Sequence, residues 1–477
     1  MRNLRYILIP LFIFFVLNLT FHYNSFRNGI LHPEAEALLL NYTDHREFLL
    51  KIFDTDYTDW KGFYQGRELS HLIDFLDYNF LAFGLKNGFI YFLSLSFYFG
   101  VFLLTLFFVM FCKKYLELHN VTTTLLTILF LTSSSLITSG GIYRSSKMGV
   151  GVSLMGLLLL LYKRYLGDNE KCRADYFLIF FTSLIAILFD RLGAYLIIAA
   201  IIVLYFSPQN HGFNRWKTIS ILLASTFTGF IYNYFIAPHI ILNLTGQFPS
   251  FAYEGVSYKR LIFLSPYYFI NGLYLFYYNI KYLAGNSDTF FVALIMGYFY
   301  YYPITKYDII AGNNHIGKYK TLITQNIAIL ISVLVVVMNS MMFLKHSVII
   351  LPDIQRTLYW LPSTVVIIFG FGLFTKTLTS EYGHKPIWLV LVMLVGCNIL
   401  AIPEHFNVLK NGHLNSYRIS TYKEVVPALE NANNPNYQTS DKFRMRPIYD
   451  FIEREIKKNP DYRLTPPREP CGFFKEC

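Results

Sequence analysis

The residues best suited to chemistry lie in an acid-rich segment near the start of the chain, over residues 34–77. Three aspartates stand out there, namely Asp44 and the closely spaced pair Asp54 and Asp56. A carboxylate can act as a general base that takes a proton from an attacking hydroxyl group. We therefore expect the catalytic base among these three residues. Two other interpretations stay open: the acids are simply solvated, or Asp54 and Asp56 belong to a turn.

The same pair has a spacing that is also found in metal sites. Asp54 and Asp56 are separated by one residue, but this spacing is a weak signal by itself. The histidines show no paired spacing of the kind that binds zinc, so we predict no metal-ligand set. We expect chemistry that requires no cofactor, with a divalent metal as the open alternative.

Basic side chains that can hold an anionic group lie in the same segment and in two later stretches. Arginine suits phosphate because its planar guanidinium group can donate two hydrogen bonds at once. We expect a departing phosphate to be held by Arg46, Arg67, Arg144, Lys147 and Arg191. An acid that activates a hydroxyl group beside cations that hold a phosphate would suit the transfer of a sugar from a lipid-linked phosphate.

Two of these stretches have a second interpretation. Arg144 and Lys147 lie on the predicted outer side of the membrane, so they either hold a lipid phosphate or are simply tolerated there. Asp190 and Arg191 interrupt an apolar stretch over residues 177–206. An ionisable pair at membrane depth is costly and is therefore a functional candidate. The alternative is a tight turn between two short helices, close to the acid-rich segment.

The surrounding sequence is that of a membrane protein. Of its 477 residues, 54% are hydrophobic and 15% are charged, and the apolar residues form long runs. A membrane-crossing helix needs about 20 mostly apolar residues, and its backbone groups must bond within the segment. We therefore predict an all-α polytopic membrane protein with about 10–12 transmembrane helices. The candidate runs are residues 6–19, 89–111, 121–139, 148–162, 177–189, 192–206, 218–236, 261–280, 289–302, 322–344, 357–374 and 387–402.

Positive charge predicts how the chain crosses the membrane. Arg2 and Arg5 precede the first run and no cleavage site follows it, which indicates a retained anchor with a cytoplasmic N-terminus. Residues 21–88 then form the first extracytoplasmic loop, with residues 72–83 as an amphipathic helix at the membrane surface. We assign residues 1–403 to the transmembrane domain and residues 404–477 to a polar C-terminal tail. If the short run at residues 289–302 does not cross, this tail also lies outside.

The net charge of +11 does not indicate a nucleic-acid partner. The lysines and arginines are scattered through the loops in ones and twos, as the preference for positive charge on the cytoplasmic side predicts. We expect the partners to be membrane lipid and a lipid-linked substrate. The sequence does not fix the oligomeric state.

An N-terminal anchor, an acid-rich external loop and many further spans, in this order, resemble the GT-C superfamily of membrane glycosyltransferases. The loop is similar to that of the Gtr-type O-antigen glucosyltransferases, in which Asp, Arg, Trp and Gly-Arg correspond to Asp44, Arg46, Trp60 and Gly66-Arg67. The resemblance implies an enzyme of the plasma or inner membrane whose active face is extracytoplasmic. It would move a sugar from a polyprenyl-phosphate donor to a glycan, lipid or protein acceptor, with Trp60 among the substrate-binding residues.

The chain departs from this pattern at two positions. Thr43 stands where the family has the first of two paired acids, and Glu68 follows Gly-Arg where Pro is usual. The choice between Asp44 and the pair Asp54 and Asp56 as the base therefore stays open.

The main rival from another class is a transporter, flippase or polymerase-like membrane protein. Such proteins place functional charges within their spans, and apart from Asp190 and Arg191 this chain has almost none there. This pattern favours the enzyme. A noncatalytic assembly subunit is the third alternative.

Overall fold

The structure of the 477-residue chain is a computed structural model, which describes the residues in several separate ranges. The described residues are 5–27, 30–31, 52–53, 64, 66–86, 94–137, 145–166, 172–206, 214–246, 248–249, 266–283, 334–337, 339, 361–416 and 420–421. The predicted run at 289–302 and most of the run at 322–344 lie outside them, as does the tail beyond residue 421.

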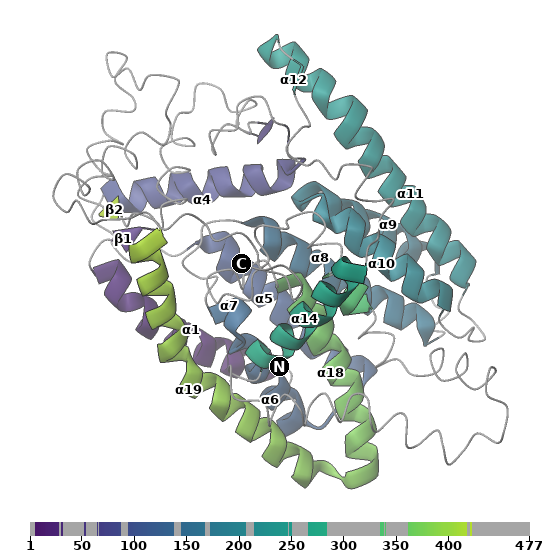
Figure 1. Cartoon of the computed structure of the whole chain (residues 1–477). Helices are drawn as coiled ribbons and strands as arrows, with labels where there is room; N and C mark the ends of the chain where they lie inside the picture. The colour runs from purple at the N-terminus through teal and green to yellow at the C-terminus, as the bar shows by residue number, and fades with distance from the viewer. Residues whose placement is uncertain are drawn as a thin grey trace.

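This part of the chain is almost entirely α-helical (Figure 1). Its principal helices are α1 (Arg5–Arg27), α4 (Glu68–Lys86), α5 (Leu95–Met110), α6 (Asn120–Leu131), α7 (Ser134–Ile137), α8 (Ser145–Tyr165), α9 (Cys172–Phe189), α10 (Leu192–Phe206), α11 (Arg215–Ile231), α12 (Ala237–Thr245), α14 (Pro266–Leu283), α18 (Leu361–Tyr382) and α19 (His384–Ser416). Two π-helical turns, η3 (Phe111–Tyr115) and η5 (Tyr232–Ile236), continue α5 and α11.

Five helical segments among the described residues are long and apolar enough to cross a membrane. They are Leu95–Tyr115, Ser145–Tyr165, Arg215–Leu244, Leu361–Ser380 and His384–Pro403. Shorter apolar helices are formed by Arg5–Asn18, Asn120–Leu131 and Leu192–Tyr205. The prediction of a helical protein with several membrane-spanning segments is therefore confirmed as far as the length and composition of these helices can show.

Helix α4 lies across the ends of other helices rather than beside them (Figure 1). Asp77 of α4 accepts a hydrogen bond from the hydroxyl of Ser94, which caps α5 (2.6 Å). Asp74 of α4 accepts one from the backbone N–H of Ser145, the first residue of α8 (2.8 Å). Both α5 and α8 therefore begin beside α4. We call this end of the bundle the α4 end.

Positive charge gathers at the opposite end of the same helices. There Lys163 near the end of α8 pairs with Asp175 near the start of α9 (2.8 Å), and Lys217 at the start of α11 lies over the Tyr176 ring (4.4 Å). Because α8 and α9 run in opposite directions, the end of α8 and the start of α9 meet at this end of the bundle.

Helix α4 turns polar side chains inward. Glu68, Asp74 and Asp77 are buried, whereas Leu76 and Phe80 are 60% and 43% exposed. A surface helix of a water-soluble protein normally buries its apolar face. The helix predicted at residues 72–83 is confirmed, but the interpretation of the loop acids as solvated does not hold for these three carboxylates.

The run at residues 121–139 is divided rather than continuous. Helix α6 ends at Leu131, and Thr132 and Ser133 separate it from the short helix α7. The Thr132 hydroxyl donates to the carbonyl of Ile128 (2.8 Å). Hydroxyl groups in such a row compete with the backbone for hydrogen bonds, which explains the break.

A short strand pair joins the start of the first loop to the tail. Strand β1 (Ile30–Leu31) pairs antiparallel with β2 (Ser420–Thr421), which follows α19. Helix α19 runs on through Pro403 to Ser416, although its apolar part ends at Pro403, near the boundary predicted from the sequence. The two segments therefore lie on the same side of the bundle.

Candidate anion-binding site

Asp190 and Arg191 form a tight turn between α9 and α10, which is one of the two interpretations of this pair. The Asp190 carbonyl accepts a hydrogen bond from the N–H of Gly193 (2.7 Å), and its Oδ1 accepts one from the N–H of Leu192 (2.9 Å). A Cβ atom at Gly193 would lie 2.4 Å from the carbonyl oxygen of Ala186, so only glycine fits. This turn holds the Asp190 carboxylate in one fixed orientation.

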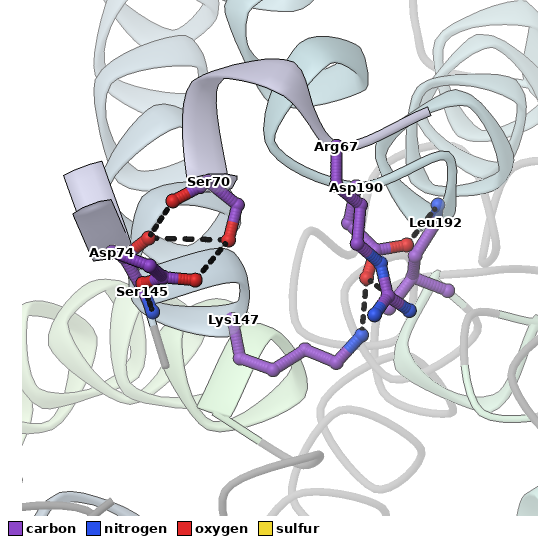
Figure 2. Close-up of polar contacts among 7 residues, drawn as sticks. All are labelled: Arg67, Ser70, Asp74, Ser145, Lys147, Asp190 and Leu192. Atoms are coloured by element: carbon purple, nitrogen blue, oxygen red, sulfur yellow. Dashed lines mark hydrogen bonds and ion pairs between the residues drawn. The ribbon is translucent and has the colours of Figure 1, made fainter. Parts of the chain in front are cut away.

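Two cations converge on one oxygen of Asp190. The Nζ atom of Lys147 lies 2.6 Å and the Nη2 atom of Arg67 lies 3.3 Å from Asp190 Oδ2. Figure 2 shows Lys147 reaching from the first turn of α8, and Arg67 from the residue before α4. All three side chains are buried, and their exposed fractions are 2%, 10% and 0%. Since buried charges need partners, the carboxylate holds both cations in place.

Gly149 lets α9 approach α8 closely enough for this contact. A Cβ atom at Gly149 would lie 2.2 Å from the ring of Phe189, the residue that precedes Asp190. No larger side chain fits there unless the two helices separate. The glycine therefore brings the end of α9 within reach of Lys147.

Arg191 is held between two aromatic rings. Its guanidinium carbon lies 4.9 Å from the ring centre of Tyr64 and 5.1 Å from that of Tyr234, and its Nη2 donates to the Tyr64 carbonyl (3.4 Å). Such contacts stabilise a cation at the face of a ring. Gly66 has a φ of +63°, and a Cβ atom there would lie 2.6 Å from Arg191 Nε. Glycine is thus needed at this position for its backbone conformation and for the space it leaves.

Tyr64 connects the start of α4 to η5. Its hydroxyl donates to the Glu68 carboxylate and lies 3.1 Å from Asn233 Oδ1. Burial, reinforced by the negative charge of Glu68, raises the pKa of Tyr64 above its ordinary value. The hydroxyl therefore stays protonated and remains a donor. Asn233 lies in a π-helical turn, an irregularity that is frequent at functional sites.

Asp74 caps the start of α8 (Figure 2). Besides accepting from the N–H of Ser145, it accepts from the hydroxyl of Ser70 (3.1 Å). Ser146, in the same first turn, is 1% exposed, and its hydroxyl has no hydrogen-bond partner among the described residues. The start of a helix carries partial positive charge and favours anions. This charge lies next to that of Lys147.

We use the name Asp190 cluster for Arg67, Lys147, Asp190 and Arg191. All four were predicted from the sequence to bind substrate, and the structure brings them together at the α4 end. The other predicted site residues lie outside the described residues: Asp44, Arg46, Asp54, Asp56, Trp60 and Arg144.

Two described residues show where the chain runs just before Asp54. The carbonyl of Ile52 lies 2.9 Å from Nδ1 of His71 on α4. Phe53 packs against a small apolar cluster that contains Tyr64 and Ala237. The segment that leads to the acid pair therefore contacts the same elements that hold Arg191.

Four residues that build the site were not predicted from the sequence to have a role there: Tyr64, Asp74, Ser146 and Asn233. Asn233 gave a usable signal, because it is an amide within the apolar run 218–236. Asp74 gave no signal that separated it from the other loop acids. Its role as a cap depends on a contact with Ser145, 71 residues further along the chain.

Within the described part of the chain, no group of three or more His, Cys, Asp or Glu side chains could hold a metal ion. Comparison with protein-family models, with curated proteins and with solved structures gives no match. The class that the fold and the site define is thus a multi-span helical protein with a buried cation cluster at one end of its bundle.

Proposed function

We propose that this chain is a membrane glycosyltransferase of the GT-C type, which moves a sugar from a polyprenyl-phosphate carrier to a glycan, lipid or protein acceptor. The convergence of Lys147 and Arg67 on the buried Asp190 is the observation that carries the proposal. A cation pair held in place before the ligand arrives needs little rearrangement to stabilise developing negative charge. The departing lipid phosphate is such a charge.

The proposed reaction uses one carboxylate and the Asp190 cluster. The carboxylate takes the proton of an acceptor hydroxyl, the hydroxyl oxygen forms a bond to the anomeric carbon of the sugar, and the bond from that carbon to the phosphate oxygen breaks. The phosphate leaves with the electron pair, and Arg67, Lys147 and Arg191 hold it.

The base in this proposal is Asp54 or Asp56, with Asp44 as the alternative. The pair follows Phe53 in the sequence, and Phe53 packs with Tyr64, whose carbonyl accepts from Arg191. This connection supports the pair over Asp44. The proposed active face is extracytoplasmic, because the cations at the other end of the bundle favour the cytoplasmic side.

A transfer assay tests the proposal directly. Purified protein in lipid nanodiscs receives a polyprenyl phosphate that carries a radiolabelled hexose, with an envelope extract as acceptor. We expect transfer by the wild-type protein, loss of transfer in the double variant Asp54→Asn with Asp56→Asn or in Asp44→Asn, and a folded protein in each case. Full activity in all of these variants would defeat the proposal.

The rival function, transport of a lipid-linked sugar, is favoured by one observation. Lys147 and Asp190 form a buried ion pair at the ends of apolar helices, and charges in such positions also occur in transporters. Proteoliposomes separate the two functions. Movement of an intact labelled lipid-linked hexose between leaflets, without transfer of its sugar, would favour the transporter.

A further inference from the structure

A second group of charged side chains lies at the end of the bundle opposite the α4 end. Lys163 Nζ of α8 lies 2.8 Å from one carboxylate oxygen of Asp175 on α9, and Arg164 Nη1 lies 3.8 Å from the other. The ring centre of Tyr176 lies 5.3 Å from the guanidinium carbon of Arg164 and 4.4 Å from Lys217 Nζ of α11. Arg164, Asp175 and Tyr176 are buried. These contacts hold the starts of α9 and α11 beside the end of α8.

Two exposed cations lie on either side of Tyr176 in this frame. Lys217 is exposed at the start of α11, and Arg173 is exposed at the start of α9. Residues three apart on a helix are neighbours, with Cβ atoms about 5–6 Å apart, so Arg173 lies beside Tyr176. Because Lys217 lies over the ring of the same tyrosine, both cations border one area of the surface. We call Arg173, Tyr176 and Lys217 the Tyr176 patch.

The two connections that meet at this end carry more positive than negative charge. Residues 163–175 and 207–217 together contain six lysines and arginines and three acids. The acids, of which Asp175 is the one that already pairs with Lys163 and Arg164, therefore leave a positive surplus. Such a surplus favours an anion at the surface.

An aromatic pair next to the patch indicates the level of the membrane surface. The ring of Trp216, which precedes Lys217, lies edge-on to that of Tyr205 at the end of α10, with 5.9 Å between the ring centres. The two residues are 56% and 52% exposed. Trp and Tyr are enriched where the hydrocarbon core of a membrane meets the headgroups. The Tyr176 patch therefore lies at the level of the lipid headgroups.

Exposed phenyl groups continue from the patch along α9. Phe177 and Phe181 are 62% and 40% exposed, and they follow Arg173 at intervals of four residues. The three side chains therefore lie along one face of the helix. The two phenyl rings are 4.3 Å apart between their centres. This face matches a ligand with a negative headgroup and an apolar chain, whereas a soluble anion would contact the cations alone.

We propose that the Tyr176 patch binds the headgroup of an anionic phospholipid, whose acyl chain lies along Phe177 and Phe181. Arg173 and Lys217 donate charge-assisted hydrogen bonds to its phosphate. Anionic phospholipids are abundant in the cytoplasmic leaflet, which is the side that these cations favour. The inference does not depend on the proposed function, because the patch and the Asp190 cluster lie at opposite ends of the bundle.

The test is a binding titration of the full-length protein in detergent with two fluorescently labelled lipids, phosphatidylglycerol and phosphatidylcholine with the same acyl chains. We expect the wild-type protein to bind phosphatidylglycerol about 10- to 30-fold more tightly, since each cation near the headgroup contributes about fivefold. Lys217→Gln and Arg173→Gln should each reduce this preference about fivefold. Lys217→Arg keeps the charge and should keep the preference.

Lys114→Gln is the matched control. Lys114 is another exposed lysine at this end, and its Nζ lies 5.6 Å from the ring centre of Tyr115, but it belongs to η3 and not to the patch. This variant should keep the preference within about twofold. Equal affinities of the wild-type protein for both lipids, or equal losses in Lys217→Gln and Lys114→Gln, would overturn the inference. A loss in Lys217→Gln that Lys217→Arg shares would mean that this lysine serves to pack against Tyr176, and it would overturn the inference as well.

Discussion

Substituting Gly66 with alanine should weaken the binding of a lipid phosphate by displacing Arg191. Gly66 adopts a φ of +63°, a conformation that costs an alanine about 1–2 kcal/mol. The new Cβ atom would also lie 2.6 Å from Arg191 Nε, whereas nonbonded atoms are ordinarily about 3.5 Å apart. The guanidinium group must therefore move by about 0.9 Å or rotate away.

Such a displacement should cost one charge-assisted hydrogen bond to the phosphate. A bond of this kind contributes about 1.5–3 kcal/mol, which corresponds to a roughly 10- to 100-fold weaker affinity. We would measure the affinity for a polyprenyl monophosphate in nanodiscs and, in parallel, the free energy of unfolding. The expected loss of stability is about 1–3 kcal/mol.

Gly383→Ala separates the two effects. Gly383 has a φ of +78°, and no atom lies within 4 Å of the position that its Cβ would take. The Gly383→Ala variant should therefore lose a similar amount of stability, because alanine is strained at a positive φ, but it should keep the wild-type affinity for the lipid phosphate. If Gly66→Ala and Gly383→Ala bind the lipid phosphate equally well, Arg191 does not hold the phosphate and the argument from this clash is refuted.

Three further predictions concern the frame of the site. Gly149→Ala should destabilise the protein by about 1–3 kcal/mol, because the new Cβ atom would overlap with Phe189. Gly156→Ala in the same helix should be neutral, because its Cβ atom would make only ordinary contacts at 3.6 Å. Thermal unfolding of the two variants compares their stabilities. Asp74→Ala should cost about 0.5–2 kcal/mol by removing the cap of α8, and Asp74→Asn, which retains an acceptor, should cost less in the same assay. The pKa of Tyr64 is raised in the folded state, so its contribution to stability should be present below pH ~10, where the unfolded side chain is still neutral, and be lost as the pH rises further. Unfolding of Tyr64→Phe measured between pH 8 and pH 11 should therefore show a flatter alkaline decline than that of the wild-type protein, and equal declines would contradict this assignment.

Much of the helical architecture could be predicted from the sequence, because an apolar run inside a membrane can form the hydrogen bonds of its backbone N–H and C=O groups in few ways other than a helix. The run at 192–206 coincides with α10 residue for residue, and the run at 148–162 forms the central part of α8. The division between α6 and α7 was not predicted. It depends on the hydroxyl side chains that begin at Thr132, and such side chains also occur inside continuous buried helices.

The site was predictable only in part. Asp190 and Arg191 could be selected because charges that interrupt apolar sequence are costly, and therefore conspicuous. Arg67 could be selected as a cation of the acid-rich segment, and Lys147 as a cation on the predicted outer side of the membrane. Their convergence on one carboxylate oxygen was not predictable. It follows from the close approach of α8 and α9 at Gly149, and glycines in apolar helices are too common to identify such a contact in advance.

Tyr64 and Asn233, whose side chains form a hydrogen bond, are 169 positions apart in the sequence. A ribosome adds about 5–20 residues per second, so Tyr64 is made roughly 10–30 s before the residue that completes its surroundings. During synthesis, the segment with Arg67 and Glu68 is therefore complete before the helices from α5 to α11 have been made. Truncated nascent chains that end before η5 should therefore leave this segment open to proteases, and those that extend beyond it should protect it.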